Sequence, residues 1–186
     1  MSNQLDGKNI AFLVANSGVE QVELTAPWEA VKDAGGQPTL IAPEASTVQA
    51  FNNDVETADR FAADVAVSDT SAGDYDALIL PGGTTNPDAL RIVPAAVNLV
   101  KAFVATPKPI AAICHGPWSL VEAGVVGGKT LTSRPSLQTD IRNAGGTWVD
   151  EKVFVCPCNG WTLVSSRKPD DLGAFCKALV EQFAGA

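Results

Sequence analysis

The sequence predicts an α/β fold: a three-layer sandwich with a mostly parallel sheet and helices on both faces. Short apolar runs recur along the chain, as in strands that are buried on both sides. Segments with helical periodicity separate these runs, and glycine pairs end two of them, at 35–36 and 145–146. Strands that alternate with helices build βαβ units, so most neighbouring strands are expected to be parallel.

In the first half of the chain, one helix and four strands are expected. The helix covers 16–36, with Val22, Ala26 and Ala30 on one face and Pro27 near its start or at a kink. A polar, irregular region follows residue 42. The expected strands are 9–15, 37–42, a short one at 64–69, and 75–83, which runs into a glycine turn.

The second half repeats the alternation and then becomes rich in short strands. Helices are expected at 94–106, 118–126, 136–146 and 169–183. Strands are expected at 108–113 and 129–133, and three more, at 147–150, 152–155 and 161–166, are consistent with a meander.

Length and composition limit the classes of protein to be considered. The 186 residues suit one domain covering 1–186, and 46% of them are hydrophobic. Thirteen basic residues against 21 acidic ones give a net charge of −8, which disfavours nucleic acid and anionic membranes as partners. The start, MSNQLDGKNI, lacks the pattern of a signal peptide, so a cytoplasmic location is expected. The four cysteines are then expected to be free thiols.

Two turns are placed where ligands gather in such folds, at the carboxyl ends of strands. They are Pro81-Gly82-Gly83 and Cys114-His115-Gly116. A cysteine between a strand and a helix can occupy a strained elbow that exposes its thiol, and a helix N-terminus would lower the pKa of that thiol. A buried structural cysteine beside a hydrogen-bonded histidine fits the same spacing, so the residues alone leave both interpretations open.

The single histidine excludes several alternatives. A catalytic triad with a histidine far downstream of Cys114 is excluded, because the sequence has no such histidine. A histidine-rich zinc site is excluded for the same reason. No G-x-G-x-x-G motif follows the first strand, so a dinucleotide site lacks its phosphate-binding turn. No metal and no cofactor are therefore expected.

The segment AAICHGPWSL, after the strand LILPGG, resembles the PfpI family of the DJ-one superfamily. The segments GVEQVELTAPWEAVKDAGG, LPGGTTNPDALR, SLQTDIRNAGG and SRKPDDLGAF resemble signatures of the same family, in the same order. The resemblance covers nearly the whole chain. It implies a flavodoxin-like sandwich similar to class I glutamine amidotransferase domains, and a homodimer or higher homo-oligomer.

The resemblance also implies roles for individual residues. Cys114 would be the nucleophile, Glu23 the buried carboxylate against its sulfur, and His115 the histidine of the protease branch. Asp88 would approach that histidine from a neighbouring subunit. Gly83 and the amide of His115 would form the oxyanion hole.

Each of these assignments has a structural alternative. Glu20 could face inward in place of Glu23, and Asp88 could cap a turn. Gly82 is expected to serve only the chain reversal.

The other three cysteines are expected to be structural. In the segment VCPCNGWTLV, the sequence departs from the polar turn of the family. A C-x-C pair could bind a soft metal or form a redox pair, but we expect Cys156 and Cys158 to pack from one strand face against the core or a partner. Cys176 shares a helical face with core leucines.

The leading hypothesis is a stress-related cysteine hydrolase. Its substrates would be a small dicarbonyl, a glycated protein or a peptide, as implied for deglycase, glyoxalase III-like or protease members of the family. The alternative is a redox sensor or holdase chaperone that acts through oxidation of Cys114.

Overall fold

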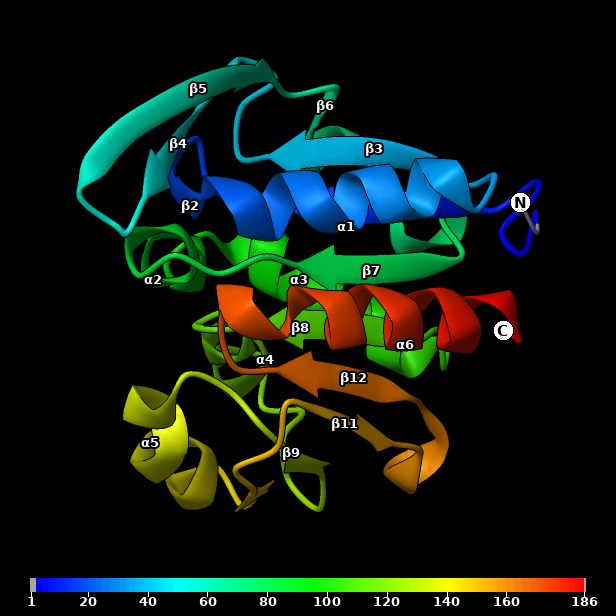
Figure 1. Ribbon diagram of the computed structural model, residues 1–186, viewed down its shortest axis with the longest axis vertical. Coiled ribbons are helices and arrows are strands. Elements are labelled where there is room, and N and C mark those ends of the chain that lie inside the picture. Colours follow the sequence, from blue (N-terminus) through cyan, green and yellow to red (C-terminus); the bar gives the residue numbers. More distant parts are fainter. Residues whose placement is uncertain (1–2, 186) are drawn as a thin grey trace.

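The computed structural model describes residues 3–185 and contains a central seven-stranded sheet (Figure 1). The strand order is β11-β12-β8-β7-β1-β3-β6, and every pair is parallel except β11 and β12. The predicted mostly parallel sheet is therefore confirmed. Its strands are β1 (Asn9–Leu13), β3 (Gln37–Ala42), β6 (Val65–Ala66), β7 (Ala77–Leu80), β8 (Ile110–Ile113), β11 (Val153–Cys156) and β12 (Leu163–Ser166).

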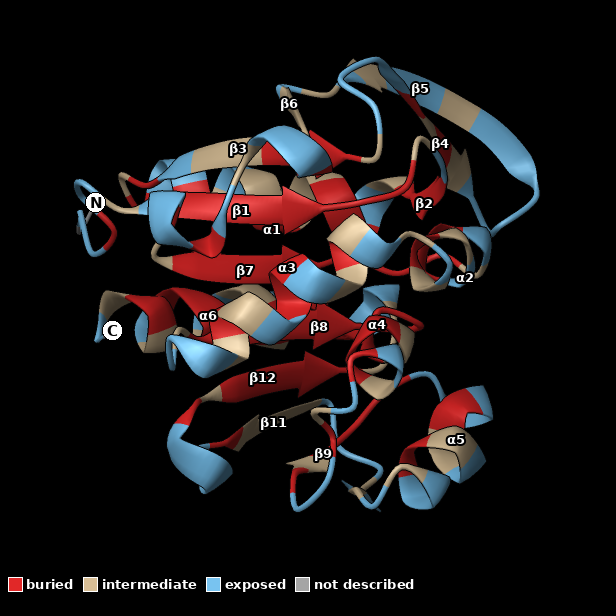
Figure 2. Ribbon diagram, turned by 180° about the vertical axis from the view of Figure 1, so that it is seen from behind, coloured by how far each residue is buried: buried red, intermediate tan, exposed pale blue. Residues whose placement is uncertain are grey.

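Helices cover both faces of this sheet and complete the sandwich (Figures 1 and 2). One face is covered by α1 (Gln21–Asp33) and α6 (Leu172–Ala184). The other is covered by α3 (Pro94–Ala105) and α4 (Pro117–Glu122), while α2 (Thr85–Arg91) packs against α3 and α4, and α5 (Gln138–Asn143) packs against α4. Strand β1 shows why both faces are apolar: Ala11 and Leu13 enter one core cluster, whereas Ile10 and Phe12 enter the other.

A hairpin occupies the region that was expected to be irregular. Strands β4 (Thr47–Asn52) and β5 (Glu56–Ala62) pair antiparallel, and β4 also pairs with β2 (Ser17–Glu20) in a three-stranded sheet. This hairpin lies beside the β3–β6 edge of the molecule (Figure 1). Most of β5 is exposed, so its sequence lacks the apolar alternation that reveals a half-buried strand.

The predicted helix at 16–36 was wrong at its start and in its buried face. The chain first forms β2, and α1 begins at Gln21. The residues of α1 that are buried are Glu23, Leu24, Pro27 and Val31, whereas Val22 is 38% exposed. Pro27 lies inside the helix, where its missing N–H leaves the carbonyl of Glu23 without the usual intrahelical donor.

Further differences concern short elements. Helix α2 was not predicted, and the expected strand at 64–69 is β6 followed by a 3₁₀ turn. The expected meander is only the antiparallel pair β11–β12. The residues before it form β10 (Thr147–Trp148), which pairs parallel with β9 (Thr130–Leu131) in a separate sheet. Between residues 3 and 185, no helix has the length and apolar character needed to cross a membrane.

Candidate active site

Cys114 lies directly after β8 on the expected strained elbow. Its φ of 61° is left-handed, a conformation that costs free energy for a residue with a side chain. The turn is crowded, because a Cβ on Gly116 would lie 2.4 Å from the carbonyl oxygen of Leu80. The strand-to-helix turn therefore fixes the direction of the thiol, which is only 7% exposed.

Glu23 is the carboxyl group beside this thiol. Its side chain is fully buried, and its Oε2 accepts a hydrogen bond from the backbone N–H of Gly82 at 2.9 Å. A Cβ on Gly82 would lie 2.3 Å from that oxygen and 2.6 Å from the Cβ of Cys114. The expectation that Gly82 serves only the chain reversal was therefore wrong: it lets the carboxyl and the thiol approach each other.

Glu20, the alternative to Glu23, points elsewhere. Its two carboxylate oxygens accept the backbone N–H groups of Asn53 and Asp54, at 3.1 and 3.2 Å. Glu20 therefore anchors the tip of the β4–β5 hairpin.

Burial raises the pKa of Glu23 to about 8, and the charges of Glu20 and Asp54 also act in this direction. The interaction with the Cys114 thiol and the hydrogen bond from Gly82 oppose the shift. Oε1 is buried and has no hydrogen-bond partner within the described part of the chain. Glu23 therefore holds its proton at neutral pH, and one of its oxygens is not engaged.

The thiol pKa does not follow the expectation from the helix N-terminus. Burial raises the pKa of Cys114, and so does the charge of an ionised Glu23. Hydrogen bonds from the backbone N–H groups of Gly83 and His115 act in the opposite direction but do not outweigh burial. Thiolate formation at Cys114 is therefore coupled to the proton on Glu23.

His115 contacts the thiol through one ring nitrogen. Its Nδ1 lies 3.2 Å from Sγ of Cys114, and its Nε2 lies 3.3 Å from Oγ of Ser136. The ring packs beside Trp118, with 5.2 Å between the ring centroids. Burial lowers the pKa of His115; the charge of Asp54 raises it and that of Arg134 lowers it. A neutral imidazole is therefore favoured next to Cys114.

Asp88 is the one predicted site residue that does not lie beside Cys114, Glu23 and His115 within the chain. It is exposed in the first turn of α2, and the carboxylate that acts on His115 within the chain is Asp54. Whether a second copy brings Asp88 to the histidine remains a prediction.

Asp54 was missed because the hairpin that carries it was missed. It occupies the left-handed turn between β4 and β5, with a φ of 65°. Its carboxylate accepts the backbone N–H of Thr84 at 2.6 Å and the hydroxyl of Thr84 at 3.0 Å. The run Asn52-Asn53-Asp54 is typical of such turns and was the available signal.

Asn86 is a second residue that sequence reasoning missed. It is fully buried, and its Nδ2 donates to the carbonyl oxygens of Pro81 and Gly82, both at 3.0 Å. Its Oδ1 accepts the backbone N–H of Ala15 at 2.6 Å. Asn86 thus joins the end of β1 to the glycine turn after β7.

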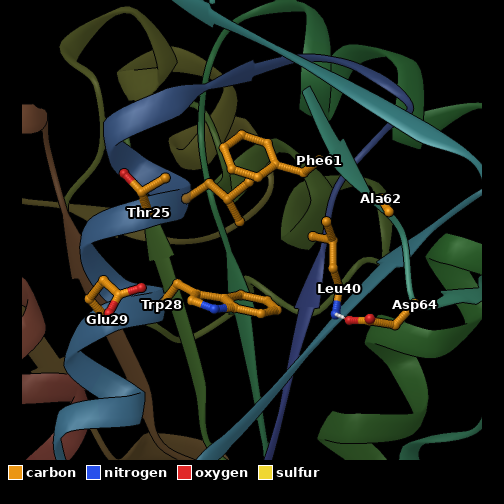
Figure 3. Close-up of a pocket in the computed structure, with 8 residues that line it drawn as sticks. Thr25, Trp28, Glu29, Leu40, Phe61, Ala62 and Asp64 are labelled. Carbon is orange, nitrogen blue, oxygen red and sulfur yellow. Dashed lines mark hydrogen bonds between the residues drawn. The ribbon is translucent and has the colours of Figure 1, made fainter. Parts of the chain in front are cut away.

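Two pockets are candidate binding sites for a substrate. An apolar pocket of about 240 Å³ lies between α1, β3 and β5, with Trp28, Leu40 and Phe61 in its wall (Figure 3). It does not include Cys114, Glu23 or His115 among its lining residues. An open cleft of about 410 Å³ adjoins His115 through Ser136, and its lining residues are Arg134, Pro135, Ser136, Asp150, Arg167 and Lys168.

The remaining cysteines are free thiols in different settings. Cys156 is buried at the end of β11, whereas Cys158 is exposed in a 3₁₀ turn. The expectation that both lie on one strand face was therefore wrong. Cys176 is partly buried and packs against the core cluster beneath α1 and α6, and burial raises its pKa to about 11. Residues 3–185 contain no group of three or more His, Cys, Asp or Glu side chains that could hold a metal ion.

Several known proteins are similar to nearly the whole chain. General stress protein 18 of Bacillus subtilis is 39% identical over 91% of this chain and 94% of its own length. "Putative cysteine protease YraA" of the same organism is 38% identical over 90% of this chain and 94% of its own length. "Deglycase PH1704" of Pyrococcus horikoshii is 35% identical over 92% of this chain and 97% of its own length.

The fold and the family agree with these relatives. The crystal structure of Drosophila melanogaster DJ-1beta superposes with a TM-score of 0.82 at 27% identity, covering all of this chain and 92% of that one. The model of the DJ-1/PfpI family matches residues 8–182. The chain therefore belongs to the DJ-1/PfpI family.

Proposed function

We propose that the protein is a cysteine-dependent enzyme that acts on reactive dicarbonyls and on the amines they modify. The observation that carries the proposal is a buried carboxyl, Glu23, with a pKa of about 8, held against the thiol of Cys114 by Gly82. A carboxyl with a pKa near the working pH can both donate and accept a proton. Rearranging a dicarbonyl requires a proton to be moved between adjacent carbons.

With methylglyoxal, the Cys114 proton passes to Nδ1 of His115, and the sulfur forms a bond to the aldehyde carbon. The N–H groups of Gly83 and His115 stabilise the resulting oxyanion. Glu23 gives its proton to that oxygen and becomes a carboxylate. Glu23 then takes the hydrogen of the same carbon as a proton and returns it to the neighbouring carbon, while the new hydroxyl proton moves to the neighbouring oxygen, which leaves the thioester of lactate. Water cleaves the thioester: His115 returns its proton to the departing sulfur, and the proton that the product acid loses restores Glu23, so that lactate is released and the thiol is regenerated.

The same attack on a methylglyoxal-modified amine would release the amine and lactate. The relative named a deglycase supports this substrate class. The cleft beside His115 supports it as well, because Arg134 suits an anionic product. The other two cations of this cleft are already paired: Arg167 with Asp150 and Asp171, at 2.7 and 2.8 Å, and Lys168 with Asp170, at 2.9 Å.

Peptide hydrolysis is a second candidate, favoured by the 3.2 Å contact between His115 and the thiol. A homodimer in which Asp88 of one copy approaches His115 of the other would complete a triad. Mixed dimers test this arrangement. An equal mixture of Asp88→Ala and Cys114→Ala chains, refolded together, should recover about a quarter of wild-type peptidase activity if the site is shared. It should recover none if each site lies within one chain.

A redox sensor is the non-catalytic alternative, since a protonated Glu23 could hydrogen-bond an oxidised Cys114. The test is a substrate panel of methylglyoxal, a glycated peptide and casein. Wild type is compared with Cys114→Ala and with Cys176→Ala, a matched control. We expect many turnovers on the first two substrates, lost only in Cys114→Ala. Stoichiometric oxidation of Cys114 without turnover would favour the sensor.

A further inference from the structure

Two more thiols, those of Cys156 and Cys158, lie at the end of the β11–β12 pair that is farther from Cys114. Cys156 ends β11 and is 2% exposed, whereas Cys158 is exposed. The backbone between them turns at Pro157, with φ −87° and ψ 3°. Two peptide steps of about 3.8 Å folded at such a turn leave the Cα atoms about 5.5 Å apart. This separation lies within the roughly 4.4–6.8 Å that disulfides span.

The turn is held in this shape by left-handed residues and by a tether. Asn159 and Gly160 have φ values of 61° and 78°. The Nδ2 of Asn159 donates to the carbonyl oxygen of Gly127 at 2.8 Å. The two thiols are therefore positioned by a defined turn that is fixed to the segment before β9.

A buried lysine lies beneath the pair. The ammonium group of Lys129 donates to the carbonyl oxygens of Cys156, at 3.3 Å, and of Cys158 and Trp161. It also lies 3.8 Å from the centroid of the Trp161 ring. Buried ammonium groups are rare without a carboxylate partner, and among residues 3–185 no carboxylate forms an ion pair with Lys129. A neighbouring thiolate would supply the missing negative charge.

Cys156 is the thiol that these groups favour as an anion. The backbone N–H of Thr130 donates to its sulfur at 3.4 Å. Burial raises the pKa of Cys156, but the N–H groups of Thr130 and Cys158, the Cys158 thiol and the charge of Lys129 together lower it below its ordinary value. The interaction with Cys156 raises the pKa of the Cys158 thiol, so Cys156 is the first of the two thiols to ionise.

We propose that Cys156 and Cys158 form a redox-active dithiol that exchanges with low-molecular-weight disulfides. The exposed Cys158 loses its proton and attacks a disulfide R–S–S–R, forming Cys158–S–S–R and releasing one thiol, which takes up that proton. The Cys156 thiolate then attacks the Cys158 sulfur and expels the second R–S⁻, which is protonated from water. The dithiol is oxidised to an internal disulfide, and the added disulfide is reduced to two thiols.

The test uses a Cys114→Ser/Cys176→Ser background, which keeps only the two thiols of interest, and glutathione disulfide as the probe. Intact-mass spectrometry should show the loss of two hydrogen atoms, and peptide mapping should show a 156–158 bond. Adding Cys156→Ser should trap one glutathione on Cys158. Adding Cys158→Ser instead should make the reaction of the protein with glutathione disulfide about tenfold slower or more, because the remaining thiol, Cys156, is buried.

Lys129→Met tests the role of the lysine. The mixed disulfide on Cys158 should accumulate and resolve at least about tenfold more slowly than in the background. Resolution at an unchanged rate would overturn the role of Lys129. If this variant does not fold, the Cys156→Ser trap decides the proposal. If the background protein keeps glutathione on Cys158 and forms no disulfide between Cys156 and Cys158, the proposed redox-active dithiol is wrong.

Discussion

The thiols of Cys114 and Cys156 are both buried, but an acidic group lies beside the first and a basic group beside the second. Cys114 faces the carboxyl of Glu23, whose charge acts with burial to raise the thiol pKa. Cys156 is next to the ammonium of Lys129, which helps backbone N–H groups to outweigh the effect of burial. Burial alone would push both pKa values upward. The neighbouring group therefore decides how each thiol ionises. Next to Glu23, Cys114 keeps a raised pKa, whereas next to Lys129, Cys156 is favoured as a thiolate.

Replacing the acid beside Cys114 should have the largest effect. Glu23→Gln keeps the shape of the side chain but removes the proton carrier, so dicarbonyl turnover should fall by roughly 10²-fold or more. Glu29→Gln, on the exposed side of the same helix, is the matched control and should retain full turnover. Steady-state kinetics on both variants decides the point. Full activity of a folded Glu23→Gln would remove Glu23 from the mechanism.

Separating the acid from the thiol should have the next largest effect. In Gly82→Ala, the new methyl group would lie 2.3 Å from the Glu23 carboxylate, so the carboxyl or the turn must move. We expect a loss of about 1–3 kcal/mol in unfolding free energy, as for overpacked cores, with a loss of turnover. Gly173→Ala meets no atom within 4 Å and should be neutral or slightly stabilising. Equal stability and turnover of the two variants would contradict the packing argument.

The buried acid should also make stability depend on pH. The pKa of Glu23 is raised from 4.5 to about 8 on folding, so the folded state binds more protons than the unfolded state between these values. The unfolding free energy contributed by Glu23 is then fully present below pH 4.5 and is lost as the pH rises toward 8. The slope is at most about 1.4 kcal/mol per pH unit.

Urea unfolding of wild type and Glu23→Gln across this range isolates the contribution. The stability of the variant, relative to wild type, should increase steadily from pH 5 to pH 8. Titrating groups that do not interact with Glu23, including His115, contribute equally to both proteins and cancel in the difference. Parallel pH profiles would show that Glu23 titrates normally.

The smallest effect should come from the distant carboxylate. The charge of Asp54 raises the pKa of both Glu23 and His115, so Asp54→Asn should lower both. His115 is the only histidine in the sequence, and its ring protons can therefore be followed by NMR without ambiguity. Asp59→Asn removes the same charge from the same hairpin and should shift the titration less. An upward shift in Asp54→Asn would contradict the proposed electrostatics.

Apolar strands that end in glycine turns led sequence reasoning to the turn that carries Cys114, because such turns lie at the sheet edge where ligands bind. Glu23 was named only through the family resemblance. Sequence reasoning could not find Asp54, since β5 is largely exposed and carries no apolar pattern. It also misjudged the buried face of α1, because that face contains Glu23 and periodicity treats a glutamate as outward-facing. The buried glutamate itself disturbed the pattern that would have oriented its helix.

The most direct test of the account is the titration of Glu23 itself. Infrared spectra of wild type minus Glu23→Gln isolate the stretching band of a protonated carboxyl group. This band should persist through pH 7 and disappear around pH 8, because burial raises the pKa of Glu23 to about 8. A band that is already absent at pH 6 would mean that Glu23 is ionised beside Cys114, and the proposed proton carrier would not exist.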